Sequence, residues 1–415
     1  MGLPREGLGH DDVLTRLEAM RADDVDWRGG RCFSLVYDGG DDVRAVARAA
    51  HDLYLSENAL NTNAFPSLGR MQADVVRAVA DLTHGGDDSA GFMTSGGTES
   101  ILVAVKAAKE RGRAERGVTE PEMVVARSAH AAFHKAARDF GVTARVIDVR
   151  DDWRADVDAM AAAVNERTVL VVGSAPQYPQ GVIDPIPEIA MLATDAGASC
   201  HVDACMGGFV LPFAERLGRD VAPWDFRVPG VTSISADVHK LGYAPKGASV
   251  IVHRTKTLRK YQTFVFDDWL GGLYASPNLL GTRAGGPIAA AWAVIHYLGE
   301  AGYLRLTATA LDAAARLVAG IDSTPALAVR GVPDAQIVCF GAADPETLDV
   351  FALGDALAAR GWYLDRQGPP DSLHATVSAG NAPMIDALLA DLRELAPAVR
   401  GAGAAGGGTD YATLE

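Results

Sequence analysis

Short apolar runs alternate with amphipathic segments through the middle of the chain, between about residues 88 and 295. The apolar runs are four to six residues long and rich in Val, Ile and Ala, which is typical of strands buried on both faces of a sheet. The segments between them have the three- and four-residue apolar spacing of surface helices. This alternation predicts an α/β fold with a mostly parallel sheet covered by helices. The predicted strands are 123–126, 144–149, 169–173, 199–202, 231–235 and 249–253.

Elements outside this region are helical on the amino-terminal side and mixed on the carboxyl-terminal side. A long helix that begins with residues 291–298 leads into the mixed part. Helices are also predicted near 13–21 and over 41–56, 70–84, 347–359 and 382–395, and the last two strands over 336–340 and 373–377.

The pattern predicts four parts of the chain. They are an N-terminal helical segment (1–56), a large domain (57–300), a small α+β domain (301–400) and a flexible tail (401–415) that opens with a glycine-rich stretch. Residues 411–415 could fold back to the functional site or be disordered. We favour disorder because chain termini are usually poorly ordered.

Composition narrows the class of protein. Apolar residues make up 48% of the 415 residues, enough for a full core, and the net charge is −15. So acidic a chain is unsuited to nucleic acid or an anionic membrane as its main partner. Its four cysteines show no disulfide-framework or metal-ligand spacing, which suits a reducing compartment. No apolar run reaches the ~20 residues of a membrane span. We therefore expect a cytoplasmic protein with no metal site and no membrane anchor.

Two lysines follow one predicted strand, and they are the strongest chemical signal. Lys240 comes directly after His239 at the end of the apolar run, and Lys246 follows six residues later, past a Gly-Tyr-Ala-Pro turn. A lysine held in this way, and partly desolvated, can lose its proton and attack an aldehyde to form a Schiff base. A solvated loop with two surface lysines is the alternative.

Three further segments carry polar residues that suit a ligand site, and two of them follow predicted strands. Gly97 and Thr98 open a helix, where bare N–H groups can cradle a phosphate; ordinary helix capping is the alternative. Asp203 ends a short strand, where a carboxylate can keep a pyridine nitrogen protonated or simply cap the next helix. His130 follows another strand, where its ring can lie flat on a planar ligand or only begin a helix.

Taken together, these segments resemble the pyridoxal-phosphate-dependent group II decarboxylases of fold type I, and most closely their sphingosine-1-phosphate lyase-like branch. The resemblance spans about residues 50–395. It implies the aspartate aminotransferase-like fold, pyridoxal 5'-phosphate as cofactor and a homodimer with a shared active site. Its main motifs are Met93-Thr-Ser-Gly-Gly-Thr-Glu-Ser100, Ala129-His-Ala-Ala-Phe133, His201-Val-Asp-Ala-Cys-Met-Gly-Gly-Phe209, Ser235-Ala-Asp-Val-His-Lys240, Gly242-Tyr-Ala-Pro-Lys-Gly247 and Tyr274-Ala-Ser-Pro277.

The same resemblance implies a role for each matched residue. Lys240 is the Schiff-base lysine, Asp203 the pyridinium partner and His130 the residue stacked on the ring. Lys246 is a second lysine needed for lyase activity. The implied phosphate contacts are Gly97, Thr98, His239 and, from the other subunit of the dimer, Ser276.

The resemblance leaves the reaction open. A carbon–carbon lyase would cleave a β-hydroxy amine, with or without a phosphate, by a retro-aldol step to an aldehyde and an amine such as phosphoethanolamine. Lys246 or Tyr243 would then accept the hydroxyl proton. An amino-acid decarboxylase would use the same electron sink. A catalytically silent binding protein is a third alternative, against which the intact set of Lys240, Asp203 and Thr98 argues. Asn61 stands where the lyases carry a His that binds the substrate phosphate, which puts a phosphorylated sphingoid substrate in question.

Overall fold

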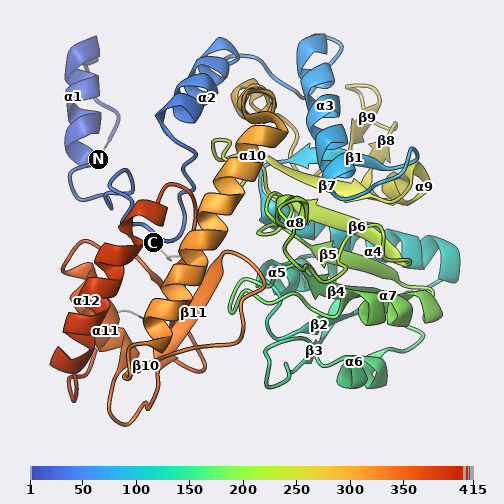
Figure 1. Cartoon of the computed structure of the whole chain (residues 1–415). Coiled ribbons are helices and arrows are strands. Elements are labelled where there is room, and N and C mark those ends of the chain that lie inside the picture. Colours follow the sequence, from blue (N-terminus) through green and yellow to red (C-terminus); the bar gives the residue numbers. More distant parts are fainter. Residues whose placement is uncertain (1, 405–407, 410, 412–415) are drawn as a thin grey trace.

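The computed structural model describes residues 2–404, 408–409 and 411. Its centre is a seven-stranded sheet in the order β1-β7-β6-β5-β4-β2-β3, with helices on both faces (Figure 1). The strands are β1 (Ala90–Thr94), β2 (Glu122–Ala126), β3 (Thr143–Ile147), β4 (Thr168–Ser174), β5 (Ser199–Asp203), β6 (Val231–Ala236) and β7 (Ser249–His253).

Helices connect and cover these strands. Those before β1 are α1 (His10–Met20), α2 (Asp41–Leu53) and α3 (Pro66–Leu82). Those within and after the sheet region are α4 (Gly97–Arg116), α5 (Ala132–Phe140), α6 (Val157–Ala163), α7 (Ile186–Asp195), α8 (Leu211–Arg216), α9 (Lys256–Arg259), η1 (Lys260–Gln262) and α10 (Gly285–Asp322).

The strands are apolar throughout because both faces of the sheet are buried. In β2, Met123 and Val125 join the cluster that contains Ile101 of α4 and Phe133 of α5. Their neighbours Val124 and Ala126 point the other way, into the larger cluster built with α7, α8 and α10. Successive side chains of a strand thus enter opposite layers, as the two-residue period requires.

Strand direction decides where the loops after the strands meet. β2 to β6 run parallel in the sheet, whereas β7 is antiparallel to both of its neighbours, β6 and β1. Two reversals cancel, so β1 points the same way as β6. The carboxyl ends of β1, β2, β5 and β6 therefore lie at one edge of the sheet.

The carboxyl-terminal part has its own antiparallel sheet, in the order β10-β11-β13-β12. The N-terminal segment joins it, because Phe33 is buried in its core and pairs with the backbone of Tyr363 and Thr376. α10 links the two sheets and contains one non-helical residue, Gly299. The elements here are β10 (Leu327–Val329), β11 (Ile337–Ala342), α11 (Val350–Ala358), β12 (Asp365–Gln367), β13 (Ser372–Thr376), η2 (Ala382–Met384) and α12 (Ile385–Ala398).

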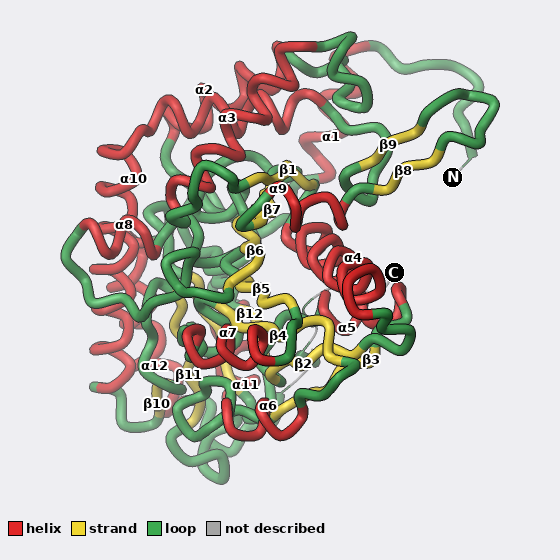
Figure 2. The backbone as a smooth tube through the Cα atoms, turned by 90° about the vertical axis from the view of Figure 1, so that its right-hand side faces the viewer, coloured by secondary structure: helices red, strands yellow, loops and turns green. Residues whose placement is uncertain are grey.

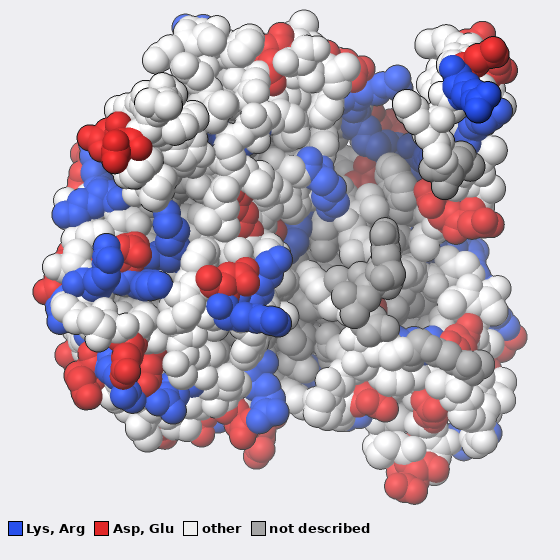
Figure 3. Space-filling model, turned by 180° about the vertical axis from the view of Figure 1, so that it is seen from behind, with Lys and Arg blue, Asp and Glu red and all other residues white. Residues whose placement is uncertain are grey.

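An exposed hairpin of β8 (Phe264–Phe266) and β9 (Tyr274–Ser276) projects from the body of the molecule (Figure 2). Basic and acidic side chains are interspersed on the face shown in Figure 3. Among the described residues, no helix combines the length and apolarity that crossing a bilayer requires. Nor does the described part of the chain gather three or more His, Cys, Asp or Glu side chains in a geometry that could hold a metal ion.

The six strands predicted in the central region are all confirmed, with ends shifted by at most a few residues. β1 was not predicted, since Ala90-Gly-Phe-Met-Thr94 lacks the Val and Ile that mark the other strands. α10 begins at Gly285, earlier than the predicted 291. The preference for disorder at 411–415 is wrong for Tyr411, which lies in the functional site described below; residues 412–415 and 405–407 lie outside the described part.

Candidate active site

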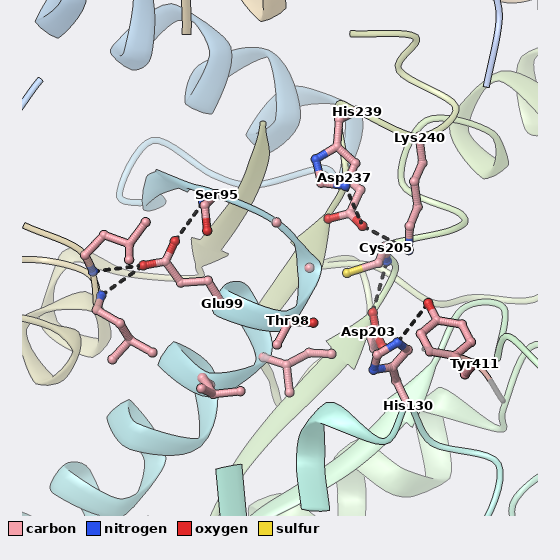
Figure 4. Close-up of a pocket in the computed structure, with 16 residues that line it drawn as sticks. Ser95, Thr98, Glu99, His130, Asp203, Cys205, Asp237, His239, Lys240 and Tyr411 are labelled. Carbon is pink, nitrogen blue, oxygen red and sulfur yellow. Dashed lines mark hydrogen bonds and ion pairs between the residues drawn. The ribbon is translucent and has the colours of Figure 1, made fainter. Parts of the chain in front are cut away.

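Five loops meet at the carboxyl edge of the large sheet and line a cavity of about 430 Å³ (Figure 4). The β1–α4 turn, the loops after β2, β5 and β6, and the segment after β9 each contribute side chains to it. Of the residues singled out in the sequence, six line this cavity: Gly97, Thr98, His130, Asp203, His239 and Lys240.

The β1–α4 turn presents a helix N-terminus to the cavity. Gly96 and Gly97 have no side chains, and a Cβ on Gly97 would lie 2.8 Å from both Asp237 Oδ2 and Cys205 Sγ. Only glycine therefore leaves the first N–H groups of α4 open to a ligand. Glu99 stabilises this turn: its carboxylate accepts hydrogen bonds from the N–H of Ser95 at 2.7 Å and of Leu279 at 3.0 Å. The arrangement is suited to a phosphate group.

Asp203 ends β5 with its side chain buried under the cavity. Its Oδ1 accepts hydrogen bonds from the N–H of Cys205 at 3.1 Å and from the Ser235 hydroxyl at 3.2 Å. These two donors fix the position of the carboxylate. A buried carboxylate of this kind can hold an aromatic nitrogen protonated.

His130 lies across the cavity from Lys240 and is held as a neutral imidazole. Burial lowers its pKa, and its Nδ1 accepts a hydrogen bond from the N–H of Ala132 at 3.1 Å. The proton must therefore be on Nε2, which lies 3.2 Å from the Tyr411 hydroxyl and donates to it. Tyr411 also meets the ring of Tyr178 edge to face, 5.3 Å between centroids. The carboxyl-terminal segment thus supplies one wall of the site.

Lys240 forms a buried ion pair on the turn after β6. Its Nζ lies 3.0 Å from Asp237 Oδ2. Burial works against the charged amine, but Asp237, together with smaller effects of Cys205, Tyr37 and Tyr411, outweighs it and raises the pKa of Lys240 above its ordinary value. His239 lies on the other side of Asp237, 3.7 Å from Nε2 to Oδ2, and burial lowers its pKa to about 4.

Lys246 and Tyr243 line a second cavity, of about 850 Å³, which meets the first at His239. The Lys246 ammonium donates to the His239 carbonyl at 3.1 Å and lies 4.7 Å from the centre of the Tyr37 ring. Desolvation and the nearby Lys240 charge lower the pKa of Lys246 to about 8. Tyr243 is buried behind the site, and burial raises the pKa of its phenol.

Ser276 and Asn61 do not line the cavity of their own chain. The Ser276 hydroxyl is buried and donates to the carbonyl of Asn278 at 2.9 Å. Asn61 is exposed, and its side chain accepts a hydrogen bond from the N–H of Asn63. The contact of Ser276 with the partner's cofactor phosphate and the contact of Asn61 with the substrate stay predictions.

Sequence reasoning missed four residues of the site. Asp237 lies in the motif Ser235-Ala-Asp-Val-His-Lys240, and Glu99 lies in the motif Met93 to Ser100. An acidic side chain next to a predicted phosphate site could have identified both residues. Cys205 stands two residues after Asp203 in another of these motifs, and burial raises the pKa of its thiol. Tyr411 carries no local signal at all, because it reaches His130 from 281 residues away.

These groups fit pyridoxal phosphate. The helix N-terminus at Gly96 and Gly97, which has no Cβ atoms, suits the phosphate of this cofactor. The buried carboxylate of Asp203 suits its ring nitrogen, and the primary amine of Lys240 suits its aldehyde. A lysine, a carboxylate and a phosphate cradle at the carboxyl edge of a mostly parallel sheet define a fold type I pyridoxal-phosphate enzyme.

Comparison with known proteins gives the family. The model of the pyridoxal-dependent decarboxylase conserved domain matches residues 24–343, so the chain belongs to that family. The chain is 41% identical to the sphingosine-1-phosphate lyase of Arabidopsis thaliana over 406 residues, which covers 96% of this chain and 74% of the plant protein. It is also 32% identical over 364 residues to a probable L-aspartate decarboxylase of Pyrococcus furiosus, covering 88% and 95% of the two chains.

Solved structures agree. The sphingosine-1-phosphate lyase of Burkholderia pseudomallei superposes with a TM-score of 0.90 at 37% identity, over 96% of this chain and 94% of the other. A glutamate decarboxylase of Lactobacillus brevis shares the fold, with a TM-score of 0.83 at 20% identity, over 100% and 96%. The protein is a pyridoxal-phosphate-dependent lyase related to the sphingosine-1-phosphate lyases.

Proposed function

We propose that this enzyme is a carbon–carbon lyase that cleaves a β-hydroxy amine, phosphorylated at its head group, to an aldehyde and a small amine such as phosphoethanolamine. The similarity to sphingosine-1-phosphate lyases from plants, animals and bacteria supports this class of substrate. The observation that carries the proposal is Lys246, a second amine whose pKa is lowered to about 8 beside the cavity that holds Lys240.

A second base is what separates the two candidate reactions. Cleaving a bond between the amine carbon and a hydroxyl-bearing carbon requires removal of the hydroxyl proton, whereas losing carbon dioxide from an ionised carboxylate requires no base at that step. Near neutral pH a fraction of Lys246 is uncharged and can accept that proton. Tyr243 is less suited, since its phenol is buried and its pKa is raised.

The remaining residues bind and orient. Pyridoxal phosphate, when bound, supplies an electron sink for negative charge at the amine carbon. In this proposal Lys240 holds the cofactor covalently, Asp203 keeps its ring nitrogen protonated and the neutral His130 lies against its ring. The phosphate contacts are the turn residues and their neighbours: Gly97, Thr98, His239 and the partner's counterpart of Ser276.

Product analysis tests the reaction. Purified enzyme is incubated with phosphorylated β-hydroxy amines of several chain lengths and, separately, with amino acids including L-aspartate. We expect an aldehyde from the first set and none of the carbon dioxide that a decarboxylase would release from the second. A Lys240→Ala variant is the control and should release neither. Carbon dioxide from an amino acid, without aldehyde from any amine, would show that the enzyme is a decarboxylase.

We also propose a homodimer whose active site is completed by the partner subunit. The β8–β9 hairpin supports the dimer in two ways. Its apolar side chains are exposed, and β9 ends in Ser276, the residue predicted to reach the partner's cofactor. Trp269 is 58% exposed and Leu270 is fully exposed, which a lone chain in water would disfavour. α1 has no buried residue either, and it exposes Leu14, Leu17 and Met20.

Light scattering and a complementation assay test the dimer. Full-length protein should elute at twice the mass of the 415-residue chain. A mixture of Lys240→Ala chains and Ser276→Ala chains should regain activity through hybrid dimers that carry one intact site. A fully active monomer, or no recovery in hybrids that demonstrably form, would contradict a shared site.

A further inference from the structure

The carboxylate of Asp237 is one of the most deeply buried charges in the described part of the chain. It follows the last residue of β6, its side chain is 1% exposed, and Oδ2 lies 3.0 Å from the Lys240 ammonium. Burial works against the charge of Asp237, but Lys240 and then His239 keep its pKa below the usual range. The pair is therefore ionised on both sides.

The position of Asp237 is unusual for a purely structural ion pair, because it faces the cavity. Its oxygens occupy the space that a Cβ on Gly97 would need, so it lies directly beside the phosphate cradle. A carboxylate at this place repels an anionic phosphate and so weakens its binding. The Asp237 charge is therefore unfavourable there unless it stabilises the Lys240 ammonium. Its neighbour Lys240 is the residue that must change its bonding in every catalytic cycle.

A lysine that holds a cofactor covalently is released whenever a substrate amine replaces it. The released lysine amine takes up the proton that the incoming substrate ammonium gives up, and an ammonium buried without a counter-charge is strongly disfavoured. Asp237 is three residues before Lys240 on the same turn, so the backbone keeps the carboxylate near the lysine. A fixed carboxylate at 3.0 Å gives the released ammonium one defined place from which to return its proton.

We propose that Asp237 is a positioning residue for the cofactor lysine: it holds the Lys240 ammonium in place before the cofactor is loaded and each time a substrate displaces the lysine. This rests on the proposed role of Lys240. Other groups also face Lys240 and stay unchanged in the test below; they are Tyr37, Asp203, Cys205, His239, Lys246 and Tyr411.

Titration of Lys240 in the cofactor-free, full-length enzyme tests the proposal directly. Formaldehyde with cyanoborohydride methylates only the neutral amine, and mass spectrometry of the peptide that contains Lys240 measures the rate at each pH. Removing an opposite charge at this distance should lower the pH of half-maximal reaction by about 1–3 units in Asp237→Asn. Asp237→Glu keeps the charge and should stay within one unit of the parent enzyme.

Asp225 offers a matched control. Its side chain is also 1% exposed and ion-paired, with Arg227 and His84, but it does not line the cavity. Asp225→Asn should leave the Lys240 titration unchanged. An unshifted midpoint in Asp237→Asn, or an equal shift in Asp225→Asn, would overturn the proposal.

A second readout uses the loaded enzyme. The pH at which the bound cofactor changes its absorbance reports the charge on the nitrogen of Lys240, and it should fall in Asp237→Asn but not in Asp225→Asn. Borohydride reduction distinguishes a failure of the proposed function from a failure of the proposed role of Asp237. If no adduct forms on Lys240, the proposed function itself fails; if an adduct forms and neither midpoint moves, only the role of Asp237 fails.

Discussion

Lys246 provides the most direct test of the lyase assignment. Its pKa is lowered from the usual 10.5 to about 8. At pH 7 an amine with a pKa of 8 is about 10% neutral, against about 0.03% for an amine with a pKa of 10.5. Desolvation and the nearby Lys240 charge together therefore give the enzyme about 300 times more free base at this position. Because the neutral form is the active one, kcat/KM should rise with pH up to about 8 and level off above it.

Replacing Lys246 by Arg keeps the positive charge but removes the base, since a guanidinium stays protonated in this range. We expect kcat/KM to fall by about 10²–10⁴-fold and the rise through pH 8 to disappear. Lys260→Arg is the matched control, because its Nζ lies 4.7 Å from the Tyr261 ring, as that of Lys246 does from Tyr37. Aldehyde release is measured from pH 6 to 10. If Lys246→Arg keeps both the rate and the rise, Lys246 is not the base.

Three further substitutions are informative. Gly97→Ala places a Cβ 2.8 Å from two side chains, and the resulting strain of about 1–3 kcal/mol should weaken cofactor binding about 5- to 150-fold. Fluorescence titration measures the affinity, and the control Gly86→Ala, which has open space around it, should not change it. Tyr411→Phe removes one hydrogen bond to His130 and should speed cofactor dissociation several-fold; an unchanged rate would mean that the carboxyl-terminal segment does not hold the ring. Asn61→His should lower KM several-fold for phosphorylated substrates only, and mainly below pH 6.5, where the imidazole is charged. A lower KM for unphosphorylated amines would contradict this prediction.

The sequence sufficed where the chemistry is local. Lys240, Asp203 and His130 each lie at or within a few residues of the end of a predicted strand, and Gly97 opens a predicted helix, so each pattern is recognisable by itself. The rule that ligands bind beyond the carboxyl ends of parallel strands then predicts that Lys240, Asp203 and His130 share one site.

Partners that are distant in sequence could not be read in this way. The direction of β1 depends on β7, which reverses against both of its neighbours, and only the assembled sheet shows that the Gly97 turn meets the Lys240 turn. Whether Tyr411 would be ordered depended on a surface 281 residues away. Termini usually lack such a surface, so the general expectation of disorder was misleading here.

By itself, then, the order of residues determined the class of fold, the cofactor and the lysine that we propose carries it, because strand patterns and strand–turn motifs are encoded within a few consecutive positions. Only the tertiary structure decided the protonation of the site. Whether Lys240 is charged, whether His130 is neutral and whether Lys246 is a base depend on burial and on charges from other loops. Those effects act through distance and desolvation, which no local pattern of residues specifies.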